Sequence, residues 1–178
     1  MITVRAAAPA EYERVGALTI TAYQTLPVDH LWGGYGDQIL DTAGRSAHGD
    51  ILVAITGDGS VVGAVTYVAD ARSPWSEGTE PGEAQFRLLA VDADARHHGA
   101  GNALVRACTE RATADDRSIL IHTTPWMEAA QRMYARLGFV RRPDRDLPYE
   151  VWNADPRSDL PPEWVGQPFL AYSWSNSA

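Results

Sequence analysis

The segment Glu83-Ala-Gln-Phe-Arg-Leu-Leu-Ala-Val91 is followed by Asp92-Ala-Asp-Ala-Arg-His-His-Gly-Ala-Gly101 and then by Asn102-Ala-Leu-Val-Arg-Ala-Cys-Thr-Glu-Arg-Ala112. The first part ends in a dense apolar run, which predicts a mostly buried strand. The last part repeats apolar residues at helical spacing, which predicts a helix. A short turn with two glycines connects the two elements, and the fold can be worked out from this strand, turn and helix.

The turn has the chemistry of an anion site. A helix start leaves backbone N–H groups unpaired, and the helix dipole places partial positive charge behind them. Phosphate is the usual anion at such a start. Gly99 and Gly101 lack a Cβ, so a phosphate can come close to the backbone, and Arg96 adds a cation.

Two common phosphate loops do not fit this turn. The nucleoside triphosphate loop needs a Gly-Lys pair, but the chain contains no lysine. The dinucleotide fingerprint Gly-x-Gly-x-x-Gly needs a third glycine after Gly101, and Leu104 stands there. What remains is Arg-x-x-Gly-x-Gly after an apolar strand.

This pattern resembles the pyrophosphate loop of the GCN5-related N-acetyltransferase (GNAT) family, Gln/Arg-x-x-Gly-x-Gly/Ala. Members often have Pro where Ala93 stands and Gly where His97 stands, and neither difference removes the backbone donors. The resemblance implies that acetyl-CoA is the cosubstrate. The residues that would hold its pyrophosphate are Arg96, His97, His98, Gly99, Ala100, Gly101 and Asn102.

A second motif supports the resemblance. The run Ala130-Gln-Arg-Met-Tyr134-Ala-Arg-Leu-Gly138-Phe139 is similar to the family's Ala-x-x-x-Tyr-x-x-x-Gly-Phe. Many members carry Asn where Met127 stands, so that contact to the pantetheine arm is not expected here. The resemblance implies that Tyr134 contacts the cosubstrate and gives a proton to its leaving thiolate. The structural alternative is a core tyrosine.

The resemblance also implies a role for the backbone of the central strand. In the family this strand is splayed from its neighbour, and its main-chain groups pair with the pantetheine arm. Leu89, Ala90 and Val91 occupy that position here. A main-chain N–H in this stretch would also donate to the carbonyl oxygen as negative charge develops on it.

The sequence offers more than one candidate for the general base. Family members often place Glu where Gln85 stands, and an amide cannot accept a proton usefully. Glu83 lies two residues earlier on the same strand face, and His122 has a side chain whose pKa suits the task. A third alternative is that no side chain serves as base. Arg87 shares the face of Glu83, and an ion pair between them would make both residues structural.

The acceptor side is predicted from composition and aromatic residues. The net charge is −8, which disfavours nucleic acid as a partner and favours a small cationic amine. Trp32, Tyr35 and Trp75 are candidates to contact the amine, together with the carboxylates of the segments 29–37 and 70–82. Packing of these aromatic side chains against the core is the alternative.

The whole chain, residues 1–178, is expected to form one N-acetyltransferase domain. The pattern predicts a mixed α/β fold whose sheet has about seven mostly antiparallel strands, with flanking helices. The predicted strands cover residues 2–6, 51–56, 60–68, 83–91, 118–122, 149–152 and 169–174, and a further strand starts at Phe139. One predicted helix starts at Pro9 and ends before Pro27. The other predicted helices cover residues 37–47, 102–112 and 127–137. Ile39, Leu40 and Ala43 are expected to point inward.

Further expectations concern chemistry and location. No apolar run is long enough to span a membrane, and the single cysteine, Cys108, fits a reducing cytoplasm and a place in the core. The five histidines show no metal-ligand spacing, so no metal is expected. A monomer and a homodimer both stay open. The alternatives to an N-acetyltransferase are a non-catalytic sensor of acyl-CoA, an O-acyltransferase and a transferase for longer acyl groups.

Overall fold

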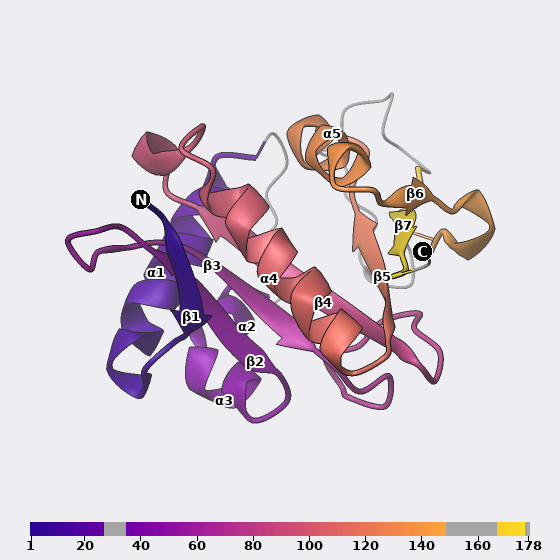
Figure 1. Ribbon diagram of the computed structural model, residues 1–178, viewed down its shortest axis with the longest axis horizontal. Helices are drawn as coiled ribbons and strands as arrows, with labels where there is room; N and C mark the ends of the chain where they lie inside the picture. The colour runs from indigo at the N-terminus through magenta and orange to yellow at the C-terminus, as the bar shows by residue number, and fades with distance from the viewer. Residues whose placement is uncertain (27–34, 149–166, 177–178) are drawn as a thin grey trace.

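The computed structural model describes residues 1–26, 35–148 and 167–176. Seven strands form one sheet in the order β1-β2-β3-β4-β5-β7-β6, with helices on both faces (Figure 1). The strands are β1 (Thr3–Ala6), β2 (Asp50–Ile55), β3 (Val61–Val68), β4 (Glu83–Val91), β5 (Ser118–Thr123), β6 (Val140–Arg141) and β7 (Leu170–Trp174). The helices are α1 (Tyr12–Gln24), α2 (Tyr35–Leu40), α3 (Thr42–Ser46), α4 (Ala100–Ala114) and α5 (Glu128–Arg136), with short 3-10 turns η1 (Pro9–Glu11), η2 (Ala93–Ala95) and η3 (Pro143–Arg145). This confirms the predicted mixed α/β class and the sheet of seven strands.

The junction between β4 and β5 divides the sheet. Among the strands that the structure describes, these two are the one parallel pair, and the others pair antiparallel. The two strands pair only at Glu83–Ser118 and Ala84–Ile119. A gap therefore opens between them towards their carboxyl ends.

Alternating side chains of the sheet build two cores. On one face, Val15 and Leu18 of α1 pack against β2 and β3, for example against Val53. On the other face, Leu104 and Cys108 of α4 pack against the opposite side of the same strands, and Figure 1 shows α4 crossing this face. Each fully buried Leu or Val contributes about 1.5–3 kcal/mol. The predicted core position of Cys108 is confirmed, since its side chain is fully buried.

The helix predicted over residues 37–47 is wrong in its extent and in part of its inward face. Two short helices replace it, because the Asp41 side chain accepts a hydrogen bond from the Gly44 N–H at 2.8 Å and starts α3 anew. Ile39 is buried as expected, but Leu40 is 52% exposed and Ala43 is exposed. Two polar residues, Thr42 and Arg45, are buried instead.

The end of the chain agrees with the prediction where the structure describes it. The predicted helix over 127–137 is α5, and Gly138 ends it with φ +87°. β7 lies between β5 and β6, pairing with both. The strand predicted over residues 149–152 lies outside the described residues.

Candidate active site

The start of α4 has the geometry of an anion site. Gly99 is the N-cap with φ +88°, and His97 is also left-handed, with φ +71°. The first helical turn closes with the Ala103 N–H donating to the Gly99 C=O at 2.9 Å. The N–H groups of residues 100–102 therefore precede the first turn and are available to an anion. No atom lies within 4 Å of the place where a Cβ of Gly99 would be, so the turn is open.

The predicted phosphate residues surround this open turn. Arg96, His97, His98 and Asn102 are all exposed, and Ala100 is buried beneath them. One guanidinium nitrogen of Arg96 donates to the Thr25 hydroxyl at 3.3 Å, which connects the turn to the end of α1. The structure thus brings the residues of the first motif together at one helix end.

A bulge in β4 lies next to the gap. Ala64 of β3 faces Ala90, whereas Thr66 faces Arg87, so β4 carries one extra residue between these pairs. Leu88 lies in the bulge with φ +53°, a conformation that is uncommon for a residue with a side chain. Beyond Ala84 the described strands form no further β4–β5 pair. This edge of β4, which includes residues 89–91, offers backbone N–H and C=O groups to an extended ligand.

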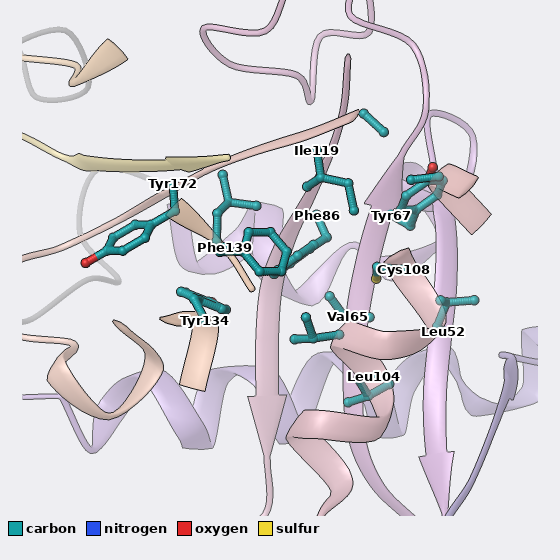
Figure 2. Packing of buried hydrophobic residues seen from close by; sticks show 14 of the residues in the cluster. Leu52, Val65, Tyr67, Phe86, Leu104, Cys108, Ile119, Tyr134, Phe139 and Tyr172 are labelled. Carbon is teal, nitrogen blue, oxygen red and sulfur yellow. The ribbon is translucent and has the colours of Figure 1, made fainter. Parts of the chain in front are cut away.

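Tyr134 of α5 lies in an aromatic cluster (Figure 2). Its ring centroid is 5.8 Å from that of Phe86, 5.7 Å from that of Phe139 and 6.2 Å from that of Tyr172. Burial raises the pKa of Tyr134, so the phenol stays protonated. Its hydroxyl forms no hydrogen bond with the parts of the chain that the structure describes. A buried phenol with an unused proton fits both a core position and a proton donor.

Glu83 has a different partner from the one expected. Both carboxylate oxygens accept hydrogen bonds from Arg145, at 3.2 and 3.0 Å. Arg87 forms its ion pair with Glu77 instead, so the expected pairing of Arg87 with Glu83 is wrong. Glu83 also lies at the end of β4 that is paired with β5, away from the bulge. Its role as base stays a prediction.

His122 lies on β5 beside the same arginine. Its Nε2 is 3.0 Å from the Arg145 C=O, and its buried Nδ1 forms no hydrogen bond within the described residues. Burial lowers the pKa of His122, which favours the neutral ring. Its role as the alternative base also stays a prediction.

Two of the three predicted aromatic residues gather around Arg87. The guanidinium of Arg87 lies 5.5 Å from the ring centroid of Trp75 and donates to the Trp75 C=O at 3.1 Å. Burial raises the pKa of Tyr35 at the start of α2, and the nearby charge of Arg87 lowers it in part. Trp32 lies outside the described residues.

Sequence reasoning counted Glu77 only among the carboxylates of the segment 70–82, yet the structure makes it distinctive. The carboxylate is 16% exposed and pairs with Arg87. Burial raises the pKa of Glu77 to about 7, although the attraction of Arg87 lowers it in part. Loop residues have no periodicity, so no sequence signal marked this one.

Comparison with known proteins identifies the family. A family model described as "Acetyltransferase (GNAT) family" matches residues 13–139. No curated protein matches the chain. An N-acetyltransferase from Staphylococcus aureus Mu50 is 19% identical and has a TM-score of 0.71, covering 98% of each chain. The protein yncA from Salmonella typhimurium, solved with its cofactor acetyl-CoA, is 14% identical with a TM-score of 0.70, covering 100% of this chain and 95% of its own.

A third similar structure has a different description. It is described as histone acetyltransferase HPA2 and related acetyltransferase, from Corynebacterium glutamicum ATCC 13032. The identity is 22% and the TM-score 0.66, with 99% of this chain and 97% of that chain covered. Likeness at these identities shows the fold, and the family model shows the family. The chain belongs to the GNAT family of acetyltransferases.

Proposed function

We propose that this protein transfers the acetyl group of acetyl-CoA directly to the primary amine of a small molecule or of a peptide N-terminus. Acetyl-CoA is the cosubstrate of the family to which the chain belongs. One observation carries the proposal, namely that the open edge of β4 runs directly into the anion turn at the start of α4. An extended thioester with a pyrophosphate at one end matches these two neighbouring features.

The proposed chemistry uses few groups of the protein. The neutral amine nitrogen attacks the thioester carbonyl carbon, the carbon–sulfur bond breaks as the new carbon–nitrogen bond forms, and the nitrogen loses one proton to water. A backbone N–H on the bulged part of β4 stabilises the negative charge on the carbonyl oxygen. The phenol of Tyr134, which burial keeps protonated, gives its proton to the leaving thiolate.

Charge and composition support the remaining parts of the proposal. The net charge of −8 favours a cationic acceptor over a nucleic acid. Within the described parts of the chain, no helix has both the length and the apolar composition needed to cross a membrane. We further propose a cytoplasmic enzyme that works as a monomer or a homodimer.

The test is a panel of amines incubated with acetyl-CoA, with the released thiol measured by colour and the product by mass spectrometry. Polyamines, amino acids, aminoglycosides and peptides with free N-termini cover the main acceptor classes. An acetylated amine supports the proposal. Tight binding of CoA with no turnover on any acceptor would indicate an acyl-CoA sensor instead. Faster turnover of hydroxyl analogues, or of longer acyl-CoA donors, would indicate the other transferase classes.

A further inference from the structure

The backbone of Glu77 is fixed to the central strand. The buried side chain of Gln85 accepts a hydrogen bond from the Glu77 N–H at 3.1 Å and donates one to the Glu77 C=O at 2.9 Å. Gln85 stands where many family members carry a glutamate, and here its amide can satisfy both backbone groups because it is donor and acceptor at once. The Gln85 amide thus fixes the loop residue Glu77 to β4. The Glu77 carboxylate then lies over the strand face on which a glutamate in place of Gln85 would lie.

The groups around this carboxylate come from three elements. Arg87 of β4 forms an ion pair with Glu77, and its side chain is 13% exposed. Tyr35 of α2 is close enough to Arg87 and to Glu77 to interact electrostatically with both. The Trp75 ring lies beside the same guanidinium in the loop. Glu77 is therefore a partly buried carboxylate next to one cation and two aromatic side chains, which is a suitable environment for an amine with an apolar body.

Tyr23 connects this cluster to the predicted proton donor. Burial raises the pKa of Tyr23, and the neighbouring hydroxyls of Tyr35 and Tyr134 raise it further. Tyr23 in the last turn of α1 therefore lies near both the cluster around Glu77 and the buried phenol of Tyr134. Tyr23 thus interacts electrostatically both with Tyr35, which belongs to the cluster around Glu77, and with Tyr134.

Position along the strand also favours Glu77 over Glu83. Arg87, which holds Glu77, is two residues before Leu89, about 7 Å along a strand. Glu83 is six residues before Leu89, about 20 Å along the same strand. Both oxygens of Glu83 are already used by Arg145, whereas within the described residues Glu77 forms its ion pair with Arg87 alone.

We infer that Glu77 is the group that binds the acceptor's ammonium and accepts its proton, and that Arg87 positions it. This inference rests on the proposed function. The ammonium form of the amine binds beside the Glu77 carboxylate and transfers one proton to it. The neutral nitrogen then attacks the thioester carbonyl carbon, and the carbon–sulfur bond breaks as the thiolate takes a proton from Tyr134. The new amide nitrogen loses its second proton to water, the Tyr134 phenolate regains a proton from water, and Glu77 returns its own proton to water.

The surroundings of Glu77 set its pKa in a range that suits a general base. Burial alone disfavours the ionised form, and Arg87 counteracts that effect. The resulting pKa of about 7 for Glu77 lies near the operating pH, where a general base is most efficient. A solvated carboxylate such as that of Glu80, which is 71% exposed, has no such environment.

The experiment compares the wild type with Glu77→Gln, Glu77→Asp and Glu80→Gln on the best acceptor of the amine panel. Rates at saturating acetyl-CoA are measured from pH 5.5 to 9. Glu77→Gln is expected to lower kcat/KM about 10²–10⁴-fold, to lose the ionisation near pH 7 and to keep the affinity for CoA. Glu80→Gln is expected to match the wild type, which controls for the loss of one charge in the same loop.

The outcomes separate the two proposals. A wild type that acetylates amines, with a Glu77→Gln variant of unchanged rate and pH profile, would overturn the role of Glu77 alone. A wild type that acetylates no amine would overturn both. Glu77→Asp covers the case in which Glu77→Gln does not fold, because it keeps a carboxylate. This variant is expected to keep the ionisation with a lower rate, and a pH profile without that ionisation would count against the inference.

Discussion

The guanidinium of Arg145 binds the carboxylate of Glu83 through two parallel hydrogen bonds, Nη1–Oε1 at 3.2 Å and Nη2–Oε2 at 3.0 Å. The same guanidinium donates to the Gly78 C=O at 2.8 Å. One side chain of η3 thereby joins the loop before β4 to the first residue of β4. This arrangement is that of a structural ion pair at the paired end of the β4–β5 junction.

Glu83→Gln should therefore reduce stability more than catalysis. Removing one partner leaves the partly buried Arg145 with only the exposed carboxylate of Glu80, at 3.8 Å, as counter-charge, which costs about 1–3 kcal/mol. Urea unfolding at pH 7.5 measures this loss, and Arg145→Gln should show a loss of similar size. The pH profile of turnover should keep its ionisation near neutrality. If that ionisation vanished in Glu83→Gln, the base would be Glu83.

Gly101→Glu should abolish binding of CoA while the fold survives. A Cβ at this position would meet the Met133 sulfur at 3.4 Å and the Val91 side chain at 3.7 Å, which are ordinary contacts. The added carboxylate would lie at the helix start that a pyrophosphate needs, and opposing like charges cost several kcal/mol, about 100-fold or more in Kd.

Calorimetry with CoA provides this measurement, and Gly57→Glu is the matched control. No atom lies within 4 Å of the place where a Cβ of Gly57 would be, and this glycine is in the β2–β3 hairpin. The control variant should bind CoA as the wild type does. Equal affinity of the Gly101 variant would show that the turn does not hold the cosubstrate.

Tyr134→Phe should reduce turnover about 10²–10⁴-fold, the usual contribution of a general acid. Stability should change little, because the hydroxyl forms no hydrogen bond with the described residues and the ring contacts remain. Single-turnover rates at saturating substrates measure the chemical step. Tyr172→Phe is the control, since it removes a hydroxyl from the same aromatic cluster, where it donates to Gln131 at 3.2 Å. Wild-type turnover in Tyr134→Phe would assign the residue to the core alone.

Glu77 should also affect stability as pH changes. The pKa of Glu77 in the folded state is raised to about 7 from 4.5. Its contribution to the free energy of unfolding is therefore fully present below pH 4.5 and is lost as pH rises through 7. The free energy of unfolding of Glu77→Gln, relative to wild type, should therefore rise between pH 4.5 and 7.5 by about 2–3 kcal/mol. Urea unfolding of both proteins across this range gives the difference, in which all other titrating groups cancel. A constant difference would show that Glu77 ionises in the folded protein as it does in water.

The parts of the fold that follow periodic patterns were predictable from the sequence. The apolar run ending at Val91 and the helical spacing after Gly101 gave the central strand and helix, because burial of one strand face or helix face imposes a period. The region around Asp41 was not predictable in this way. A single capping side chain divides the helix there, and which side then points inward depends on tertiary packing.

The site was predictable only where backbone geometry defines it. Glycines at a strand-to-helix turn leave a recognisable pattern, so the anion turn and its residues came from the sequence. Side-chain pairs between distant segments leave none. The partner of Glu83 is Arg145 of η3, far along the chain. Glu77 differs from the other carboxylates of its loop because Gln85 fixes its backbone to β4.

The two-residue junction of β4 and β5 has a consequence for the lifetime of the protein. A ligand lying in the gap contacts both halves of the sheet where few backbone hydrogen bonds join them, and it binds only the folded chain. At a free concentration 100 times its Kd, such a ligand adds about 2.7 kcal/mol to the free energy of unfolding. Amides of β5 beyond Ile119 should then exchange with solvent more slowly when the gap is filled. The fraction of unfolded chains open to proteolysis therefore decreases as the supply of that ligand rises.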